Sequence, residues 1–297
     1  MSYLVFLFVF FFGAVIGSFL NVVILRLNTG ASLSGRSRCF TCSTQLRWFE
    51  LFPVLSFFVL RGKCRSCRSS ISCQYPIVEL LSGALFVLTL YKITTQSVPS
   101  LDYASEATLF SQLPLMSMVV YAMLWSILLV VAVYDIRHKI IPSALVYCVA
   151  VLAVIRIVAI VLLGDGMFPP FIAALSSGLL LALPFFLIWF FSHGHAMGFG
   201  DVQLALVLGL FLTLPKAIAV FVLAFWIGGL VGIVMLALER FRLFFSMRKN
   251  SLNLVKGHVT MKSEIPFAPF LVVSFAVVFF CTVDIYSLIA VFERLWL

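Results

Sequence analysis

Charged residues are scarce in this chain of 297 residues: only 10% are Asp, Glu, Lys or Arg, whereas 63% are hydrophobic. A soluble domain is typically about 25% charged and about 45–50% apolar. A water-soluble fold of this length cannot cover so much apolar surface with so few charges. The composition therefore excludes a soluble enzyme, a disordered chain and a soluble nucleic-acid-binding domain, and it predicts a polytopic membrane protein.

Several common catalytic patterns are also absent from the sequence. It has no Gly-x-Ser-x-Gly nucleophile motif, no His-Glu-x-x-His zinc-protease motif and no phosphate-binding Gly-Lys-Thr loop. The alternation of apolar and polar residues that marks the strands of a membrane β-barrel is missing as well. The expected fold class is therefore all-α, and the candidates for chemistry are the few acidic residues and the cysteines.

Eight apolar segments are candidates for membrane-spanning helices, because a bilayer core needs about 20 apolar residues per helix. They cover residues 3–25, 76–92, 113–134, 143–163, 169–191, 201–214, 216–238 and 269–291. No basic segment precedes the first one and no small-residue cleavage site follows it, so a retained helix is expected rather than a signal peptide. The sequence thus predicts a first transmembrane helix (1–25), a cytoplasmic domain (26–75) and a larger transmembrane domain (76–297).

The basic residues are distributed unevenly between the two sides of the expected membrane. The segments on one side, which are 26–75, 135–142, 192–200 and 239–268, hold 16 of the 20 Lys and Arg residues. Because basic residues accumulate in cytoplasmic loops, this side is expected to be cytoplasmic. The net charge of +9 therefore reports orientation, and no basic stripe with interleaved aromatics indicates nucleic-acid binding.

One apolar stretch in the cytoplasmic domain, residues 48–60, is too short to span a membrane and is interrupted by Pro53. Apolar segments of this kind pack either at the membrane interface or against the helical bundle. Both placements remain open from the sequence.

Four of the seven cysteines form two Cys-x-x-Cys pairs in the cytoplasmic domain, namely Cys39, Cys42, Cys64 and Cys67. Zinc takes four thiolates in a tetrahedron, and each pair supplies two of them. Two disulfides are the alternative, which a reducing cytoplasm disfavours. Four thiolates leave no open position for water, so the prediction is a structural zinc that stabilises a domain with little core. Cys73 is an additional thiol nearby, a spare or competing ligand.

Two of the 11 acidic residues lie at the expected cytoplasmic ends of helices, Asp135 after the third span and Asp201 at the start of the sixth. Gly198 and Gly200 precede Asp201 and are expected to allow a close backbone approach and positive φ. Two neighbouring carboxylates share a proton and can activate water against a peptide carbonyl. The pattern predicts an aspartic peptidase, whereas each residue alone would be interpreted as a helix cap (Asp201) or an interface charge (Asp135).

Taken together, these features resemble the type IV prepilin peptidases, a family of intramembrane aspartic leader peptidases with a Gly-x-Gly-Asp motif. The resemblance extends over nearly the whole chain. It is carried by Gly17-Ser-Phe-Leu-Asn-Val22, the two cysteine pairs, Tyr75-Pro-Ile-Val-Glu-Leu-Leu81, Asp135 with Ile141-Pro142, Gly198-Phe-Gly-Asp201 and Ile265-Pro-Phe-Ala-Pro-Phe270.

The resemblance implies a bifunctional enzyme of the bacterial inner membrane, acting for type IV pilus and type II secretion systems. Such an enzyme cleaves the basic leader of prepilins and related pseudopilins on the cytoplasmic face and then methylates the new N-terminal amine with S-adenosylmethionine. The resemblance makes Asp135 and Asp201 the peptidase pair and the four paired cysteines the zinc ligands. The methyltransferase activity rests on the resemblance alone, since no soluble-type cofactor motif is present.

Three alternatives remain open from the sequence. The first is a peptidase of the same kind without methyltransferase activity. The second is a secondary transporter, which would place its acidic residues near the middle of the membrane. The third is a zinc-dependent assembly or scaffold protein, which would need the cysteines but not the aspartates.

Overall fold

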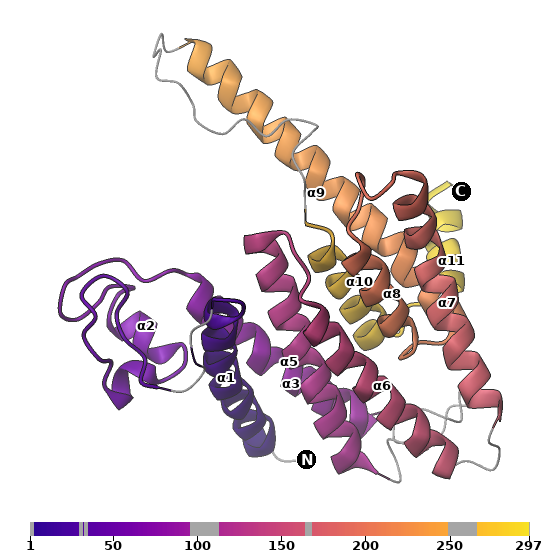
Figure 1. Ribbon diagram of the computed structural model, residues 1–297, viewed down its shortest axis with the longest axis horizontal. Coiled ribbons are helices and arrows are strands. Elements are labelled where there is room, and N and C mark those ends of the chain that lie inside the picture. Colours follow the sequence, from indigo (N-terminus) through magenta and orange to yellow (C-terminus); the bar gives the residue numbers. More distant parts are fainter. Residues whose placement is uncertain are drawn as a thin grey trace. The chain divides into compact units, whose positions relative to one another are not determined.

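The structure is a computed structural model that describes residues 3–29, 32, 35–95, 113–163, 168–248 and 266–296. These residues are helical, with two isolated β-bridges and no strand among them, which confirms the predicted all-α class. The elements in chain order (Figure 1) are α1 (Tyr3–Arg26), η1 (Trp48–Leu51), α2 (Leu55–Val59), α3 (Gln74–Thr95), α5 (Pro114–His138), α6 (Ser143–Leu163), α7 (Phe168–Phe191), α8 (Phe199–Gly209), α9 (Leu214–Arg248), α10 (Ala268–Cys281) and α11 (Ile285–Trp296).

Six of the described helices, α1, α3, α5, α6, α7 and α9, are long and apolar enough to cross a membrane. The protein is therefore a multi-pass membrane protein. Helix α8 has 11 residues and α10 has 14, so at 1.5 Å per residue they rise only about 16 and 21 Å. Both are shorter than a hydrocarbon core of about 30 Å, and the expected count of eight spans is not confirmed.

The expected continuous span over residues 269–291 is divided into α10 and α11. Helix α10 ends at Cys281, and Thr282 adopts a left-handed backbone with φ of 53°. Before α11, the Asp284 carboxylate accepts a hydrogen bond from the backbone N–H of Ser287, whose hydroxyl accepts one from the backbone N–H of Asp284. This capping satisfies N–H groups at the start of a new helix, so local capping interrupts the apolar run.

Contacts within the chain define two compact units. The first comprises Met1–Val133 and Tyr147–Phe171, and the second comprises Tyr134–Val146 and Ile172–Leu297. The four paired cysteines belong to the first unit. Asp135 and Asp201 both belong to the second unit, although they lie in different helices.

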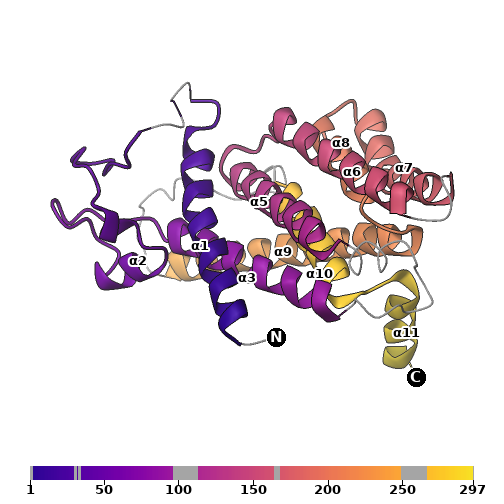
Figure 2. The ribbon, with the colours of Figure 1, turned by 90° about the horizontal axis from the view of Figure 1, so that it is seen from below.

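In the first unit, α1 and α3 lie side by side (Figures 1 and 2). Small residues allow this close approach, since a Cβ atom at Gly17 would lie 2.8 Å from the Cα atom of Glu79. The Ser82 hydroxyl also donates a hydrogen bond of 2.7 Å to the carbonyl oxygen of Gly13. Close backbones and hydrogen bonds between helices stabilise helix pairs in an apolar solvent. The segment between α1 and α3 is thus held at both of its ends by one helix pair.

In the second unit, α8 packs against α7 with the two backbones almost in contact. A Cβ atom at Gly209 would lie 2.6 Å from the Cα atom of Gly178 and 2.7 Å from the carbonyl oxygen of Ser177. A side chain at Gly209 would require a backbone to move, and one at Gly178 would lie 3.0 Å from the carbonyl oxygen of Leu206. Helix α10 in turn packs on α9 and α8, so α8, which carries Asp201, is held between neighbouring helices.

Replacing Gly209 with alanine should destabilise the second unit, because the new methyl group cannot enter the α7–α8 contact without moving a backbone. Overpacking of this kind costs about 1–3 kcal/mol, and the midpoint of thermal unfolding in detergent should fall. Gly229→Ala is the matched control, since nothing lies within 4 Å of its Cβ position in α9. Equal unfolding midpoints for the two variants would contradict this packing.

Candidate active site and metal centre

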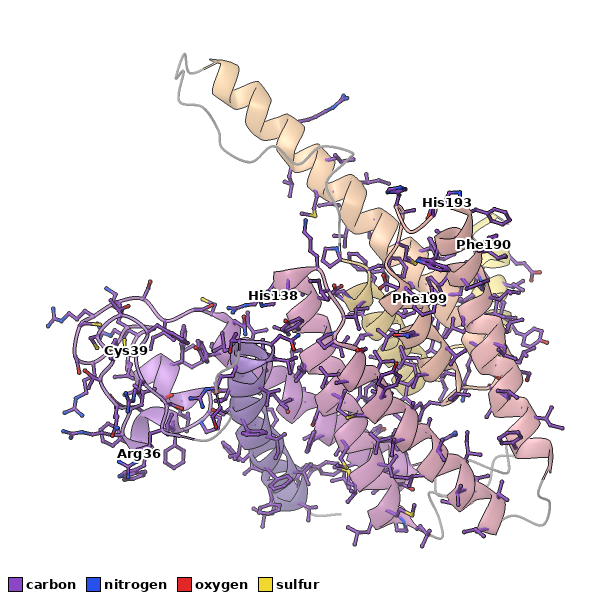
Figure 3. All side chains as sticks on the ribbon, in the orientation of Figure 1. Arg36, Cys39, His138, Phe190, His193 and Phe199 are labelled. Carbon is purple, nitrogen blue, oxygen red and sulfur yellow. The ribbon has the colours of Figure 1, made fainter. Side chains whose placement is uncertain are left out.

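The structure brings the four paired cysteines together in the segment between α1 and α3, where Cys39 is labelled in Figure 3. Their four Sγ atoms all lie within 4.8 Å of one another, and those of Cys39 and Cys67 are 3.8 Å apart. All seven cysteines of the chain are free thiols, so no disulfide forms. Cys73 is exposed and lies outside this cluster of four.

The two Cys-x-x-Cys pairs share one backbone conformation. In each, the residue after the second cysteine, Ser43 or Arg68, donates its N–H to the carbonyl oxygen of the first cysteine at 2.9 Å. These two residues also have nearly identical left-handed backbones, with φ of 57° and 56°. An isolated β-bridge closes each turn. Because serine and arginine have no chemistry in common, the shared conformation comes from the Cys-x-x-Cys turn itself.

The hydrogen bonds of the cluster favour the thiolate form at Cys39 and Cys67. At Cys64 the backbone N–H groups of Cys67 and Ser66 are outweighed by burial and by the neighbouring thiols of Cys39 and Cys67, so the pKa of that thiol is raised. Backbone N–H groups of Cys42 and Thr41 stabilise the charged sulfur of Cys39 and lower the pKa of its thiol to about 6. A hydrogen bond from the Ser69 hydroxyl is the main cause of a lowered pKa at Cys67. Thiolates are the form that binds metals. With Zn–S bonds of about 2.3 Å, a tetrahedron has sulfur atoms about 3.8 Å apart, so the four cysteines fit a zinc ion.

A second cluster contains the two predicted aspartates. Asp135 lies in the last turn of α5, which ends where Lys139 donates its N–H to the Asp135 carbonyl oxygen and adopts φ of 55°. Asp201 lies in the first turn of α8. Their side chains are only 4% and 8% exposed, and their charges interact. The structure therefore places two buried carboxyl groups together at the end of one helix and the start of another.

The glycines before Asp201 act differently from what the sequence led us to expect. Gly198 has φ of −72° and is the N-cap residue of α8, and Gly200 is not among the positive-φ glycines either. The expected positive φ is therefore wrong at both positions. The expected close approach is found at Gly200, where a Cβ atom would lie 3.0 Å from the Cβ atom of Ile141. Glycine at this position lets the start of α8 contact the segment that follows Asp135.

The two carboxyl groups have different surroundings. Oδ2 of Asp135 accepts a hydrogen bond of 3.2 Å from the backbone N–H of Ala268, the first residue of α10. Oδ1 of Asp201 is buried and has no hydrogen-bond partner among the described residues. Gly198 is the N-cap residue, and its backbone N–H interacts with the Asp201 carboxylate, so Asp201 contributes to capping α8 while its Oδ1 atom is left without a hydrogen-bond partner among the described residues. Burying an unpartnered polar atom costs free energy, which is a common property of functional sites.

An aromatic cluster holds the residue before Ala268. The ring of Phe267 lies 5.5 Å from that of Phe185 in α7 and 5.3 Å from that of Phe225 in α9, centre to centre. Phe185 and Phe225 stack on each other at 5.8 Å. Packing of this kind fixes the turn that precedes α10 and hence the direction of the Ala268 N–H. The sequence placed residues 265–270 in the resemblance but predicted no role for them, since nothing local pairs a backbone N–H with a carboxylate 133 residues away.

The described histidines are not part of the group with metal-ligand geometry. His193 and His195 are exposed in the turn between α7 and α8, where His193 is labelled in Figure 3. Within the described part of the chain, the four cysteines form the one group with metal-ligand geometry. The His-Gly-His sequence is therefore not part of a metal site in these residues.

Comparisons with known protein families match both halves of the chain. Residues 11–93 match the bacterial peptidase A24 N-terminal domain, and residues 122–233 match the type IV leader peptidase family. The first region contains the cysteine cluster, and the second contains Asp135 and Asp201. No solved structure gives a significant match.

Several curated proteins named prepilin leader peptidase/N-methyltransferase are similar to this chain. The protein of Myxococcus xanthus is 34% identical over 77% of this chain and 62% of its own length. That of Bacillus subtilis is 29% identical over 88% of both chains. That of Klebsiella pneumoniae is 30% identical over 71% of this chain and 88% of its own length. The chain thus spans less than two thirds of the Myxococcus protein and most of the other two.

The purified protein should contain about one zinc ion per chain, bound by four thiolates. Cys64→Ser should lose that zinc, because three thiolates bind it far more weakly and Cys64 is buried in the cluster. Cys73→Ser is the matched control and should keep the full zinc content. Elemental analysis after gel filtration measures both, and a Cys73→Ser variant that lost zinc would contradict the ligand set.

Proposed function

Because this chain belongs to the type IV leader peptidase family, we propose that it is a membrane-embedded aspartic endopeptidase that removes the leader of type IV prepilins and related pseudopilins. The observation that carries this proposal is the pair of buried carboxyl groups, Asp135 and Asp201, whose charges interact within one unit. A charge inside a membrane protein is expensive and marks function by default. Two charges together add repulsion, which a structural role does not require.

We base the proposed roles of the two groups on the difference in their surroundings. The Ala268 N–H, at the positive end of the α10 dipole, stabilises a negative charge on Asp135. Burial and, after it, the charge on Asp135 disfavour a negative charge on Asp201, and they outweigh the backbone N–H of Gly198, which favours it. The Oδ1 atom of Asp201 receives no hydrogen bond from the described residues. The pair then holds one proton, and Asp201 carries it. In this arrangement Asp135 is the general base and Asp201 is the general acid.

Cleavage follows in two proton-balanced steps. Asp135 takes a proton from the attacking water as the new C–O bond forms at the scissile carbonyl, while Asp201 gives its proton to the carbonyl oxygen. The tetrahedral intermediate then collapses and the C–N bond breaks. Asp135 passes its proton to the leaving amine, and Asp201 recovers a proton from the intermediate's hydroxyl group. Both carboxyl groups end in their starting states, and the leaving amine is the new N-terminus of the pilin.

We place this site on the cytoplasmic side of the bacterial inner membrane, because the helix ends that carry Asp135 and Asp201 belong to the side expected to hold 16 of the 20 basic residues. The leader would be cut where the apolar segment of the substrate leaves the bilayer. A secondary transporter is less compatible with this site, since its acidic residues would lie near the middle of the membrane. Asp135 lies instead in the last turn of a 25-residue helix.

The second activity in this proposal is methylation of the new N-terminal amine with S-adenosylmethionine as the methyl donor. The names of the relatives support it.

The proposal also gives each part of the chain a role. Within the cytoplasmic domain (26–75), a zinc ion that stabilises the fold would be held by Cys39, Cys42, Cys64 and Cys67. The transmembrane domain (76–297) would carry the peptidase site, and 1–25 would be the first transmembrane helix.

Asp135→Asn and Asp201→Asn should each reduce leader cleavage by at least about a thousandfold, because neither half of the pair can complete the proton transfers alone. Mass spectrometry of a prepilin incubated with the enzyme in detergent measures the product. With S-adenosylmethionine present, the wild-type product should also carry one added methyl group. A product that lacks the methyl group would restrict the enzyme to proteolysis.

Asp284→Asn is the matched control for these variants, since Asp284 contributes its carboxylate to the start of α11. It should cleave at the wild-type rate. Normal cleavage by a folded Asp135→Asn or Asp201→Asn variant would refute the proposed pair.

Phe267→Ala should lower kcat about 10- to 100-fold and leave KM nearly unchanged, because loss of the ring lets the Ala268 N–H move away from Asp135. Phe267→Tyr keeps the ring and should keep most of the rate. Phe190→Ala removes an exposed ring from α7 and controls for loss of aromatic surface. A rise in KM with kcat unchanged would show that Phe267 contributes to substrate binding instead.

A further inference from the structure

The short helix α2 in the first unit exposes three of its four apolar side chains. Leu55, Phe58 and Val59 lie at positions i, i+3 and i+4, which form one helix face, and Phe58 and Val59 are 66% and 80% exposed. Ser56 and Phe57 are both half-buried. A helix on a water-soluble surface has the opposite arrangement. The environment outside this face is therefore expected to be apolar.

The apolar face continues into η1 and the turn that follows it. Trp48 is 75% exposed, and its ring contacts that of Phe52 at 5.9 Å between centres. Leu51 is exposed as well. The exposed apolar side chains of this segment are called the 48–59 face below. They are Trp48, Phe49, Leu51, Phe52, Leu55, Phe58 and Val59. A continuous exposed apolar surface of this kind marks an interaction site.

A hydrogen bond fixes this segment at a defined height along a membrane-spanning helix. The backbone N–H of Val54, between η1 and α2, donates to Oε2 of Glu79 at 2.7 Å. Glu79 lies five residues after the start of α3 at Gln74, which is about 7 Å along the helix axis. Helix α3 is long and apolar enough to cross the bilayer. The segment is therefore held beside the first turns of a span, at the depth of the membrane interface.

Basic residues surround the apolar face. Arg47 and Arg61 flank it directly in the sequence, and both are exposed, as are three further cations, Lys63, Arg65 and Arg68. The one acidic residue of the segment, Glu50, is engaged by the backbone N–H of Arg47 at 2.7 Å. Apolar and aromatic side chains surrounded by cations complement an anionic bilayer surface, where each basic residue contributes about 1 kcal/mol.

We propose that the 48–59 face is a membrane-docking surface that inserts into the boundary between headgroups and acyl chains of the bilayer that α1 and α3 cross. The flanking arginines contact anionic headgroups. Docking would hold the cysteine-rich segment against the membrane surface. The segment would then not extend freely into the cytoplasm, as its sequence alone suggests. The inference rests on residues of the first unit alone and does not depend on the peptidase assignment.

Trp48 reports directly on this surface. The full-length protein is placed in lipid nanodiscs that contain phosphatidylglycerol, and the emission of a Trp48→Phe variant is subtracted from that of the wild type to isolate Trp48. Lipids brominated near the headgroup end of their chains should quench this difference signal about twofold or more, as expected for a ring at the interface. Aqueous iodide should quench it little.

Every other pattern overturns the proposal. Quenching by iodide without quenching by brominated lipid would place the face in water. Quenching by neither would show that protein, such as the remaining helical bundle or a second chain, covers it.

Substitutions inside and outside the 48–59 face test whether the quenching of Trp48 depends on this face. Phe58→Ser should reduce lipid quenching of Trp48 and increase iodide quenching, because it places a polar side chain in the face. Phe40→Ser is the matched control, since Phe40 is also exposed, to 80% against 66% for Phe58, but lies in the first cysteine pair, outside the 48–59 face. Arg47→Gln combined with Arg61→Gln should remove most of the difference between phosphatidylglycerol and phosphatidylcholine discs. Identical quenching of Trp48 in all these variants would contradict the proposal.

Discussion

The rest of the second unit is organised around the burial of two carboxyl groups that repel each other. Asp135 and Asp201 are held together although each would be better solvated apart, so the surrounding helices must supply the free energy that keeps them in place. Three features do so: Gly200 lets the start of α8 contact Ile141, Gly209 lets α8 lie against α7, and the Ala268 N–H compensates the charge on Asp135. Helices α8 and α10 are too short to span a membrane. Helix α8 positions the Asp201 carboxyl group, and the start of α10 positions the Ala268 N–H.

Much of this architecture was predictable from the sequence, because long apolar segments with few charges form helices that cross the bilayer. Six of the expected spans appear as long helices at nearly the predicted bounds, and the structure brings together both pairs of cysteines and both aspartates. The break between α10 and α11 was not predictable from hydropathy, because Thr282 and the capping by Asp284 act through backbone geometry. The Ala268 N–H and the ring of Phe267 were missed for a related reason: their partners are distant in the sequence.

The proposed docking of the 48–59 face gives the many basic residues of the cytoplasmic segment a second role. A basic leader, which the family resemblance implies for the substrate, would be repelled by a loop of free arginines. If Arg47 and Arg61 contact anionic headgroups, their charge is largely compensated before a substrate arrives. The zinc-stabilised segment would then lie at the level where an apolar substrate helix leaves the membrane, which is where both cleavage and methylation of a new N-terminus must take place.

The central claim is that the aspartate pair holds a single proton and that Asp201 carries it. Infrared difference spectroscopy of the full-length protein with isotope-labelled aspartate, at neutral pH, tests this directly, because a protonated carboxyl group absorbs separately from a carboxylate. The account predicts one protonated aspartate band in the wild type that is missing in Asp201→Asn. A wild-type spectrum without that band, or an unchanged band in Asp201→Asn, would contradict it.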